Sequence, residues 1–188
     1  MRSRPLSSLF RAARLTFTGL ALLLATGTFA WGEGSTTAGV TLLKNRQYQE
    51  ALTTGIRSAR KSVLCCFYLF KATDTNNNMP RRIIEELVKA ARRGVDVTVI
   101  LERNRKHDDN LNRDNLHTAA LLSRGGVKVF FDSPKVTTHA KVAVIDRRYV
   151  YLGSHNLTQS ALTHNNELSV LIDSPAMAGE IISYLQKL

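Results

Sequence analysis

The chain has 188 residues, 44% of them hydrophobic, and its 26 lysine and arginine residues outnumber 15 acidic residues to give a net charge of +11. This length allows one well-filled core and leaves hardly enough residues for a second. The basic balance favours a polyanionic partner, which would be nucleic acid or an anionic membrane surface.

The first 30 residues differ in composition from the rest of the chain. They hold four arginines and no acidic residue, and residues 15–30 form an apolar stretch with small residues near its end. This layout is typical of a secretory signal peptide, and it predicts an exported, periplasmic or secreted protein. The stretch is 16 residues long, shorter than the roughly 18–20 residues of a spanning helix. A retained anchor in the inner membrane and a mitochondrial presequence remain open. Cleavage would leave 22 basic and 15 acidic residues, a charge of +7.

The elements that follow alternate between strands and helices. Residues 31–44 are rich in glycine, serine and threonine in their first part and are predicted to be a linker, and residues 45–188 are predicted to form one domain. Strands are expected at residues 62–70, 95–101 and 127–132, and helices are expected at residues 47–60, 83–91, 116–126 and 175–188.

Individual residues support these boundaries. Asn78 is placed to cap the second helix, and Ser174 is placed to cap the last one. Cys65 and Cys66 lie in a strand that is apolar on both faces. They are predicted to be buried thiols, because neighbouring side chains of a strand point to opposite faces and cannot form an unstrained disulfide. Residues 102–115 are polar and are predicted to be a loop.

The alternation of elements predicts an α/β fold with a mixed, mostly parallel sheet that is flanked by helices on both faces. Ligand sites in such sheets usually lie at the ends of strands, and polar loops follow two of the predicted strands. The functional site is therefore expected at one end of the sheet.

Residues 138–156 place polar side chains in an otherwise apolar strand and hairpin. Alternate residues of a strand share a face, so His139 and Lys141 would lie side by side among small or apolar neighbours. An uncompensated charge is costly there, and an anionic ligand is expected. The returning strand would deliver the hydroxyl of Ser154 and the amide of Asn156 at its far end. This set predicts a phosphate pocket and is not a typical set of metal ligands.

The spacing of this stretch resembles the signature motif of the phospholipase D superfamily, His-x-Lys, four residues, Asp, six residues, Gly-Ser-x-Asn. The matching residues are His139, Lys141, Asp146, Gly153, Ser154 and Asn156, and Glu167 occupies the place of the family's downstream acidic residue. From about residue 45 onward, the order of elements also resembles the small bacterial endonucleases of that superfamily. The resemblance implies a phospholipase D-like fold with residues 45–188 as the catalytic domain.

The resemblance also implies a reaction that uses no metal or other cofactor. His139 would be the nucleophile that forms a covalent phosphohistidine, and Glu167 would hold the other nitrogen of its ring. Lys141, Ser154 and Asn156 would bind the phosphate oxygens and stabilise their charge.

Two parts of the implied site stay open. Asp146 belongs to the motif, and it either orients His139 or Lys141 or anchors the end of its strand. The leaving alkoxide needs a proton from a second histidine, and this chain has one copy of a motif that the family usually carries twice. The resemblance therefore implies a homodimer with one shared active site on the two-fold axis. His155, inside the motif, is the alternative acid.

Nucleic acid is the first substrate class to consider, because basic residues follow the predicted strands. These loop cations are Arg81, Arg82, Arg103, Arg105, Lys106 and Arg113. The alternative is a phospholipase D that hydrolyses phosphatidyl lipids such as phosphatidylcholine, which a membrane-bound N-terminus would suit. Two weaker hypotheses are a non-catalytic phosphate-binding module and a metal-dependent nuclease built on residues 107–114.

Overall fold

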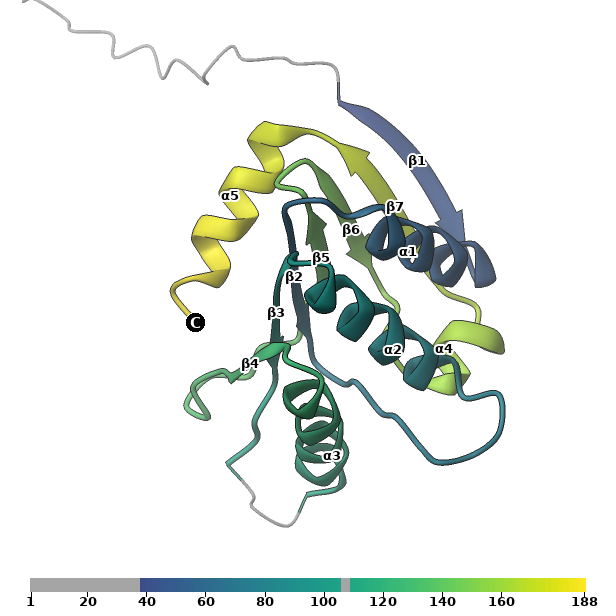
Figure 1. Cartoon of the computed structure of the whole chain (residues 1–188), viewed down its shortest axis with the longest axis vertical. Coiled ribbons are helices and arrows are strands. Elements are labelled where there is room, and N and C mark those ends of the chain that lie inside the picture. Colours follow the sequence, from purple (N-terminus) through teal and green to yellow (C-terminus); the bar gives the residue numbers. More distant parts are fainter. Residues whose placement is uncertain (1–37, 106–108) are drawn as a thin grey trace, which may run out of the picture. The chain divides into compact units, whose positions relative to one another are not determined.

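A seven-stranded mixed sheet forms the centre of the fold in the computed structural model, which describes residues 38–105 and 109–188 (Figure 1). The strands are β1 (Gly39–Lys44), β2 (Ser62–Phe67), β3 (Asp96–Leu101), β4 (Lys128–Phe131), β5 (Lys141–Ile145), β6 (Tyr149–Gly153) and β7 (Leu168–Asp173). Their order across the sheet is β1-β7-β6-β5-β2-β3-β4. The predicted signal peptide or anchor, residues 1–30, lies outside the described residues.

The α/β fold and the mixed sheet are confirmed, but antiparallel pairs outnumber parallel ones. Strands β2, β3 and β4 run parallel, and the remaining four of the six pairings, β1–β7, β7–β6, β6–β5 and β5–β2, are antiparallel. The prediction of a mostly parallel sheet is therefore wrong. The alternation of strands and helices holds only for the first part of the domain, whereas β5 and β6 are joined by a tight turn that only antiparallel strands can use.

The predicted linker is wrong over its last residues, because Gly39–Lys44 form the edge strand β1. Its pairing with β7 runs from Gly39 opposite Asp173 to Lys44 opposite Leu168. Of the side chains of β1, only Leu43 is buried. The sequence therefore shows no alternation of buried and exposed residues that would predict this strand. The strand forms because its backbone pairs with β7, which is far away in the chain.

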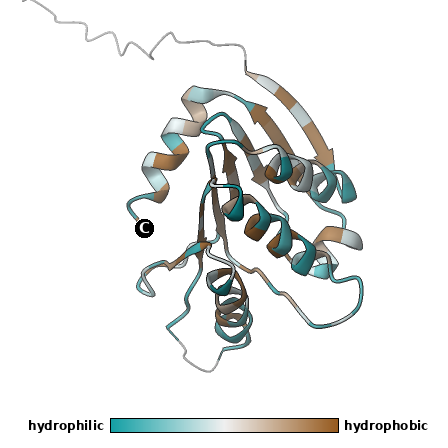
Figure 2. Ribbon diagram, viewed as in Figure 1, coloured by the Kyte–Doolittle hydropathy of each residue, from teal (hydrophilic) through white to brown (hydrophobic). Residues whose placement is uncertain are grey.

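Helices cover both faces of the sheet, as the sequence predicted. They are α1 (Arg46–Ser58), α2 (Met79–Arg92), α3 (Asn110–Arg124), α4 (Gln159–Thr163) and α5 (Pro175–Leu185). One buried apolar cluster joins the first four helices to one face, and a smaller cluster joins α5 to the other. Figure 2 shows this arrangement as hydrophobic strands between helices with one hydrophobic side. No helix in residues 38–105 and 109–188 is long and apolar enough to cross a bilayer.

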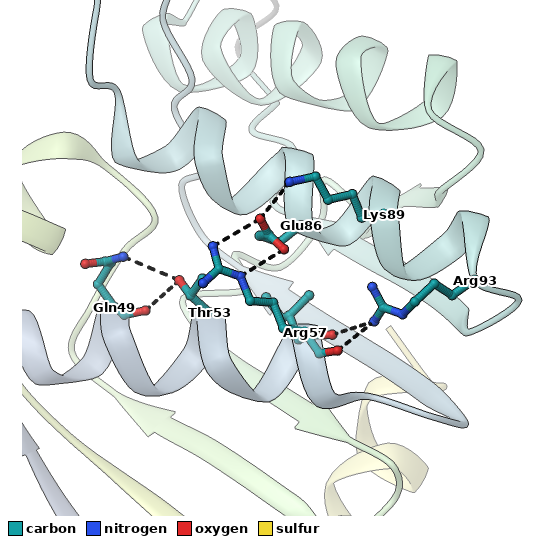
Figure 3. Close-up of polar contacts among 7 residues, drawn as sticks. Gln49, Thr53, Arg57, Glu86, Lys89 and Arg93 are labelled. Atoms are coloured by element: carbon teal, nitrogen blue, oxygen red, sulfur yellow. Dashed lines mark hydrogen bonds and ion pairs between the residues drawn. The ribbon is translucent and has the colours of Figure 1, made fainter.

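Charged side chains connect α1 and α2 on the outer surface of the larger helical layer (Figure 3). The buried carboxylate of Glu86 accepts from Arg57 at 3.2 Å and from Lys89 at 3.0 Å. The hydrogen bond from Arg57 lowers the pKa of Glu86 against the effect of its burial. Arg93 donates to the main-chain oxygens of Ile56 and Arg57 at the end of α1. These contacts hold the two helices together at a distance from the sheet.

Helix capping agrees with the sequence at two helices and corrects it at a third. Asn78 accepts from the main-chain N–H of Arg81, and Ser174 caps α5 in the same way. Asp109 caps α3, which begins at Asn110, so the second half of the predicted loop 102–115 is helical. The buried side of this helix includes Leu111 and three polar residues, Asn112, Asn115 and Thr118. Because these positions are polar, the sequence lacks the apolar repeat by which an amphipathic helix is recognised.

Candidate active site

The motif residues meet at one end of the sheet because of how β5 pairs with its neighbours. Lys141 begins β5 opposite Phe67, the last residue of β2. Gly153 ends β6 opposite Ser169 at the start of β7. Residues that precede β5 and β7 and residues that follow β2 and β6 therefore lie at the same end of four adjacent strands.

His139 and Lys141 are in contact, as their spacing predicted. Lys141 Nζ lies 3.2 Å from Nδ1 of His139 and 2.9 Å from its main-chain oxygen. The imidazole is exposed, whereas the lysine is only 7% exposed. Burial lowers the pKa of Lys141, and the negative charge of Glu167 opposes that shift. A cation with restricted access to water thus lies directly beside an accessible imidazole.

Tyr68 also lies against this pair and was missed by the sequence analysis. Its ring centroid is 4.4 Å from that of His139, and Lys141 Nζ lies 5.2 Å from the centre of the same ring. The main-chain N–H of Tyr68 donates to Ala140 at 2.9 Å, which fixes the residue just beyond β2. In the sequence, Tyr68 is one of several aromatic residues in a predicted apolar strand, so nothing indicated that it would contact His139.

Ser154, Asn156 and Glu167 form the other side of the site. The hydroxyl of Ser154 donates to the carboxylate of Glu167 and accepts from the main-chain N–H of Leu168 at 3.0 Å. Asn165 also donates to Glu167, at 3.1 Å. Asn156 Oδ1 is buried and has no hydrogen-bond donor among the described residues.

The expected contact between Glu167 and His139 is not formed. In the described part of the chain, the carboxylate of Glu167 accepts from Ser154 and Asn165, and its main-chain N–H donates to the side chain of Asn45. His139 hydrogen-bonds to Lys141. Glu167 influences the site through its charge, which acts on Lys141.

Gly153 is required by packing. A Cβ atom at this position would lie 2.1 Å from Ser169 Oγ and 2.4 Å from Ser169 Cα. The absence of a side chain lets β6 approach β7 closely just before Ser154. The approaching group is thus a neighbouring strand of the sheet.

Asp146 does not join the site, so its assignment to the catalytic set is corrected. It follows β5 at the end opposite Lys141. Its carboxylate accepts the main-chain N–H groups of Arg60, Lys61 and Ser62 at 2.7–3.1 Å. Burial alone would raise the pKa of Asp146, but these bonds outweigh it and hold the pKa below its ordinary value. Of the two roles left open, the structure supports the anchor.

His155 is excluded as a local acid by its position. It is fully buried, with Nδ1 at 2.7 Å from Ser169 Oγ and Nε2 at 3.0 Å from the main-chain oxygen of Asn45. Its ring stacks on Tyr48 with centroids 4.3 Å apart. Burial lowers the pKa of His155, so it is a neutral core residue at pH 7.

Most of the predicted loop cations are held by local partners. Three of them contact polar side chains: Arg81 pairs with Asp74, Arg82 donates to Asn77, and Arg113 donates to Asn110. Arg103 lies over the ring of Phe131. Arg105 donates to the main-chain oxygens of Pro134 and Lys135. Lys106 lies outside the described residues. These contacts fix the cations near the surface without placing them at His139.

The acidic stretch at residues 107–114 does not form a metal site within the described residues. Asp109 caps α3, and Asp114 forms an ion pair with Lys71 at 3.1 Å. His107 and Asp108 lie outside the described residues. Among residues 38–105 and 109–188, no group of three or more His, Cys, Asp or Glu side chains lies close enough together to hold a metal ion.

Comparison with known proteins matches the chain to one family model and to proteins of similar structure. Residues 52–188 match the family model described as "Cardiolipin synthase, PLD-like domain". The phospholipase D family member Nuc from Salmonella typhimurium is similar in structure, with a TM-score of 0.66 and 26% identity over 80% of this chain and 93% of that one. NucT from Helicobacter pylori has a TM-score of 0.63 and 26% identity over 80% and 94% of the two chains.

A curated relative differs in size and in its named activity. Polyphosphate kinase from Escherichia coli strain K12 is 30% identical over 107 residues, which are 53% of this chain and 15% of the kinase. The chain thus spans only a small part of this relative's length.

Proposed function

The chain belongs to the phospholipase D superfamily, and from this premise we propose that it is a metal-independent phosphodiesterase, in first place a nuclease acting on DNA or RNA. The observation that carries the proposal is the contact between the exposed His139 imidazole and the buried Lys141 ammonium, 3.2 Å apart, with Asn156 at the same end of the sheet. An accessible imidazole beside a held cation suits attack on a phosphate group.

The proposed reaction has two steps. A ring nitrogen of His139 attacks phosphorus, the bond from phosphorus to the leaving oxygen breaks, and a second imidazole gives that oxygen a proton. Water then gives a proton to the second imidazole and attacks phosphorus, and the phosphorus–nitrogen bond to His139 breaks. Lys141, Ser154 and Asn156 bind the non-bridging oxygens, while the charge of Glu167 balances that of the lysine.

The second imidazole is proposed to come from another copy of the chain. Among the described residues, the His139 ring contacts Tyr68 and Lys141, whereas His155 is buried in the core. A homodimer with the two-fold axis at the site would supply a second His139.

An exposed apolar strip offers a surface for that second copy. Leu42, Val170 and Leu152 lie opposite one another across β1, β7 and β6, on the face that α5 covers only in part. Leu42 is 51% exposed and Leu152 is 39% exposed. Beside α5, a cavity of about 400 Å³ lined by Ile100, Phe130 and Ile182 continues the same face. Exposed apolar side chains in such a row are typical of an interface.

Hydrolysis of phosphatidyl lipids such as phosphatidylcholine is the second candidate. The description of the matching family model names a lipid-synthesising enzyme, and a retained N-terminal anchor would hold the site at a membrane. We keep export of the chain, with residues 1–30 as signal peptide or anchor, as part of the proposal. The basic composition favours the nucleic-acid candidate.

The test incubates the purified chain in chelator with labelled single- and double-stranded DNA, RNA and phosphatidylcholine vesicles, with His139→Ala as the matched inactive variant. Cleavage of nucleic acid that persists in chelator and disappears in the variant is the expected result. Release of choline with nucleic acid intact would establish the lipid candidate instead. No reaction on any substrate would overturn the proposed enzyme and favour a phosphate-binding module.

Sedimentation equilibrium tests the dimer. Leu152→Arg should give monomers with little activity, whereas Leu116→Arg, which alters an exposed leucine on α3, should leave both unchanged. Full activity in a monomeric Leu152→Arg protein would exclude the shared site.

A further inference from the structure

Two carboxyl groups are buried together at the ends of the neighbouring strands β3 and β4. Glu102 follows β3 and is 2% exposed, and Asp132 follows β4 and is 5% exposed. The proposed reaction uses neither of them. Burying one carboxylate is costly and burying two in contact is more so, unless a cation or a proton compensates the charge.

Among residues 38–105 and 109–188, the neighbouring groups supply no cation to this pair. In the part of the chain that the structure describes, neither carboxylate forms an ion pair. Strand β2 presents the Cys66 thiol, whose pKa burial raises to about 12, so the thiol is neutral. Helix α3 presents the amide of Asn115, which donates to the main-chain oxygen of Glu102 at 2.9 Å. The guanidinium of Arg103 lies over the ring of Phe131, 6.0 Å from its centroid.

A proton is therefore the group that compensates the pair. Asp132 Oδ1 accepts the main-chain N–H of Arg103 at 2.8 Å, but the buried Oδ2 has no donor among the described residues. Burial and the hydrogen bond to Asp132 raise the pKa of Glu102 to about 7. With one proton, the pair forms a carboxyl–carboxylate hydrogen bond, and without it two buried charges repel each other.

Glu102 also connects directly to the segment that carries His139. Its Oε2 accepts the main-chain N–H of Thr138 at 2.6 Å, and Thr138 is buried. The connection from β4 to the site is exposed from Ser133 to Thr137, so this bond is its buried attachment immediately before the imidazole. On the other side, Asn115 donates to the main-chain oxygen of Tyr68, whose ring touches His139, at 2.9 Å. The pair thus lies behind both sides of the imidazole.

We propose that Glu102 and Asp132 share one proton and act as positioning residues, which hold His139 in place through the main-chain N–H of Thr138 and release it when the proton is lost. This inference rests on the proposed function for its effect on rate and on the fold alone for its effect on Thr138. A carboxyl with a raised pKa contributes stability that is complete below the pKa of an unfolded glutamate, about 4.3. That contribution is lost as pH rises through about 7.

Glu102→Gln tests the proposal because glutamine reproduces the protonated pair. Its amide can donate to Asp132 and accept from Thr138, and it does not ionise. In the natural chain, about a tenth of the pair keeps its proton one pH unit above the pKa. We expect kcat/KM of Glu102→Gln to match the natural chain near pH 6 and to exceed it about tenfold at pH 8. Glu102→Ala should lower kcat/KM at every pH by about 10–100-fold, because His139 loses its attachment.

A matched control and a readout independent of activity complete the experiment. Glu86→Gln removes another buried carboxylate, which lies in the contacts between α1 and α2 (Figure 3) and does not touch the site. It should change stability and leave the pH profile as in the natural chain. Measured in His139→Ala proteins, which lack the adjacent imidazole, the NMR shift of the Thr138 amide should titrate near pH 7 with Glu102 present and in Glu86→Gln, and it should not titrate in Glu102→Gln.

The outcomes separate this inference from the proposed function. If no substrate is cleaved, the proposed function fails, and the Thr138 titration still decides whether the shared proton exists. A Thr138 amide that does not titrate between pH 5 and pH 9 would overturn the inference. So would pH profiles that coincide for the natural chain and Glu102→Gln.

Discussion

Replacing Asp146 should reduce the stability of the protein while the folded protein keeps the proposed activity. The Asp146 carboxylate accepts three main-chain N–H groups, two from the connection between α1 and β2 and one from the first residue of β2, the shortest bond being 2.7 Å from Lys61. It also begins the turn between β5 and β6, where Asp146 and Arg147 have φ of 54° and 56°. Asn is the right replacement, because it tolerates this left-handed conformation and retains one acceptor oxygen.

The size of the effect follows from the lost charge. A hydrogen bond to a charged group contributes about 1.5–3 kcal/mol and a neutral one about 1 kcal/mol. The bonds share one carboxylate, so we expect Asp146→Asn to lower the free energy of unfolding by about 1–3 kcal/mol, or Tm by about 3–10 °C. Because the folded pKa of Asp146 is lowered, its contribution is complete above the unfolded pKa of about 3.9 and is lost as pH falls below it. The variant should therefore lose less stability on acidification than the natural chain.

Thermal unfolding at pH 7 and pH 3.5, together with kcat/KM at a temperature where both proteins are folded, measures both parts of this prediction. An unchanged Tm with a loss of kcat/KM of a hundredfold or more would show that Asp146 acts on the reaction and that the anchor interpretation is wrong.

Three further changes test other contacts. Gly153→Ala should lower Tm by several degrees because its Cβ would overlap Ser169, whereas Gly179→Ala, with open space around it, should leave Tm equal or higher; equal Tm values for both would refute the packing argument. His155→Ala should destabilise the fold by about 2–4 kcal/mol in urea unfolding without moving the pH profile of rate, and a moved profile would restore His155 as an acid. Tyr68→Leu should lower kcat/KM by about tenfold or more with little change in Tm, and unchanged kinetics would show that its ring does not hold the imidazole.

The part of the site that the sequence predicted is the part made by local chain geometry. His139 and Lys141 are two residues apart at the entrance to a strand, and a tight turn returns the chain to Ser154 within one hairpin. Strand periodicity and turn chemistry fix such placements before any distant segment is considered. The strand and hairpin that carry the motif could therefore be predicted, although the prediction that the sheet is mostly parallel was wrong.

The parts that the sequence did not predict depend on distant partners. Strand β1 has mostly exposed side chains and is defined by its pairing with β7. The first turns of α3 bury polar residues where an amphipathic helix would have apolar ones. Asn115 can be buried because it hydrogen-bonds to the main chain of Tyr68, Phe70 and Glu102. A buried amide with several main-chain partners is indistinguishable, in sequence, from an amide in a polar loop.

Asp146 and Glu102 show why protonation states also required the structure. Each is an acidic residue directly after an apolar strand, and the sequence gives no reason to treat them differently. Asp146 meets three main-chain N–H donors, which stabilise its charge and lower its pKa. Glu102 meets another carboxyl, and its pKa rises to about 7. The difference arises because β5 ends beside the connection from α1 to β2, whereas β3 ends beside β4. The order of strands, more than the residue type, therefore decides which acid stays charged and which can hold a proton close to His139.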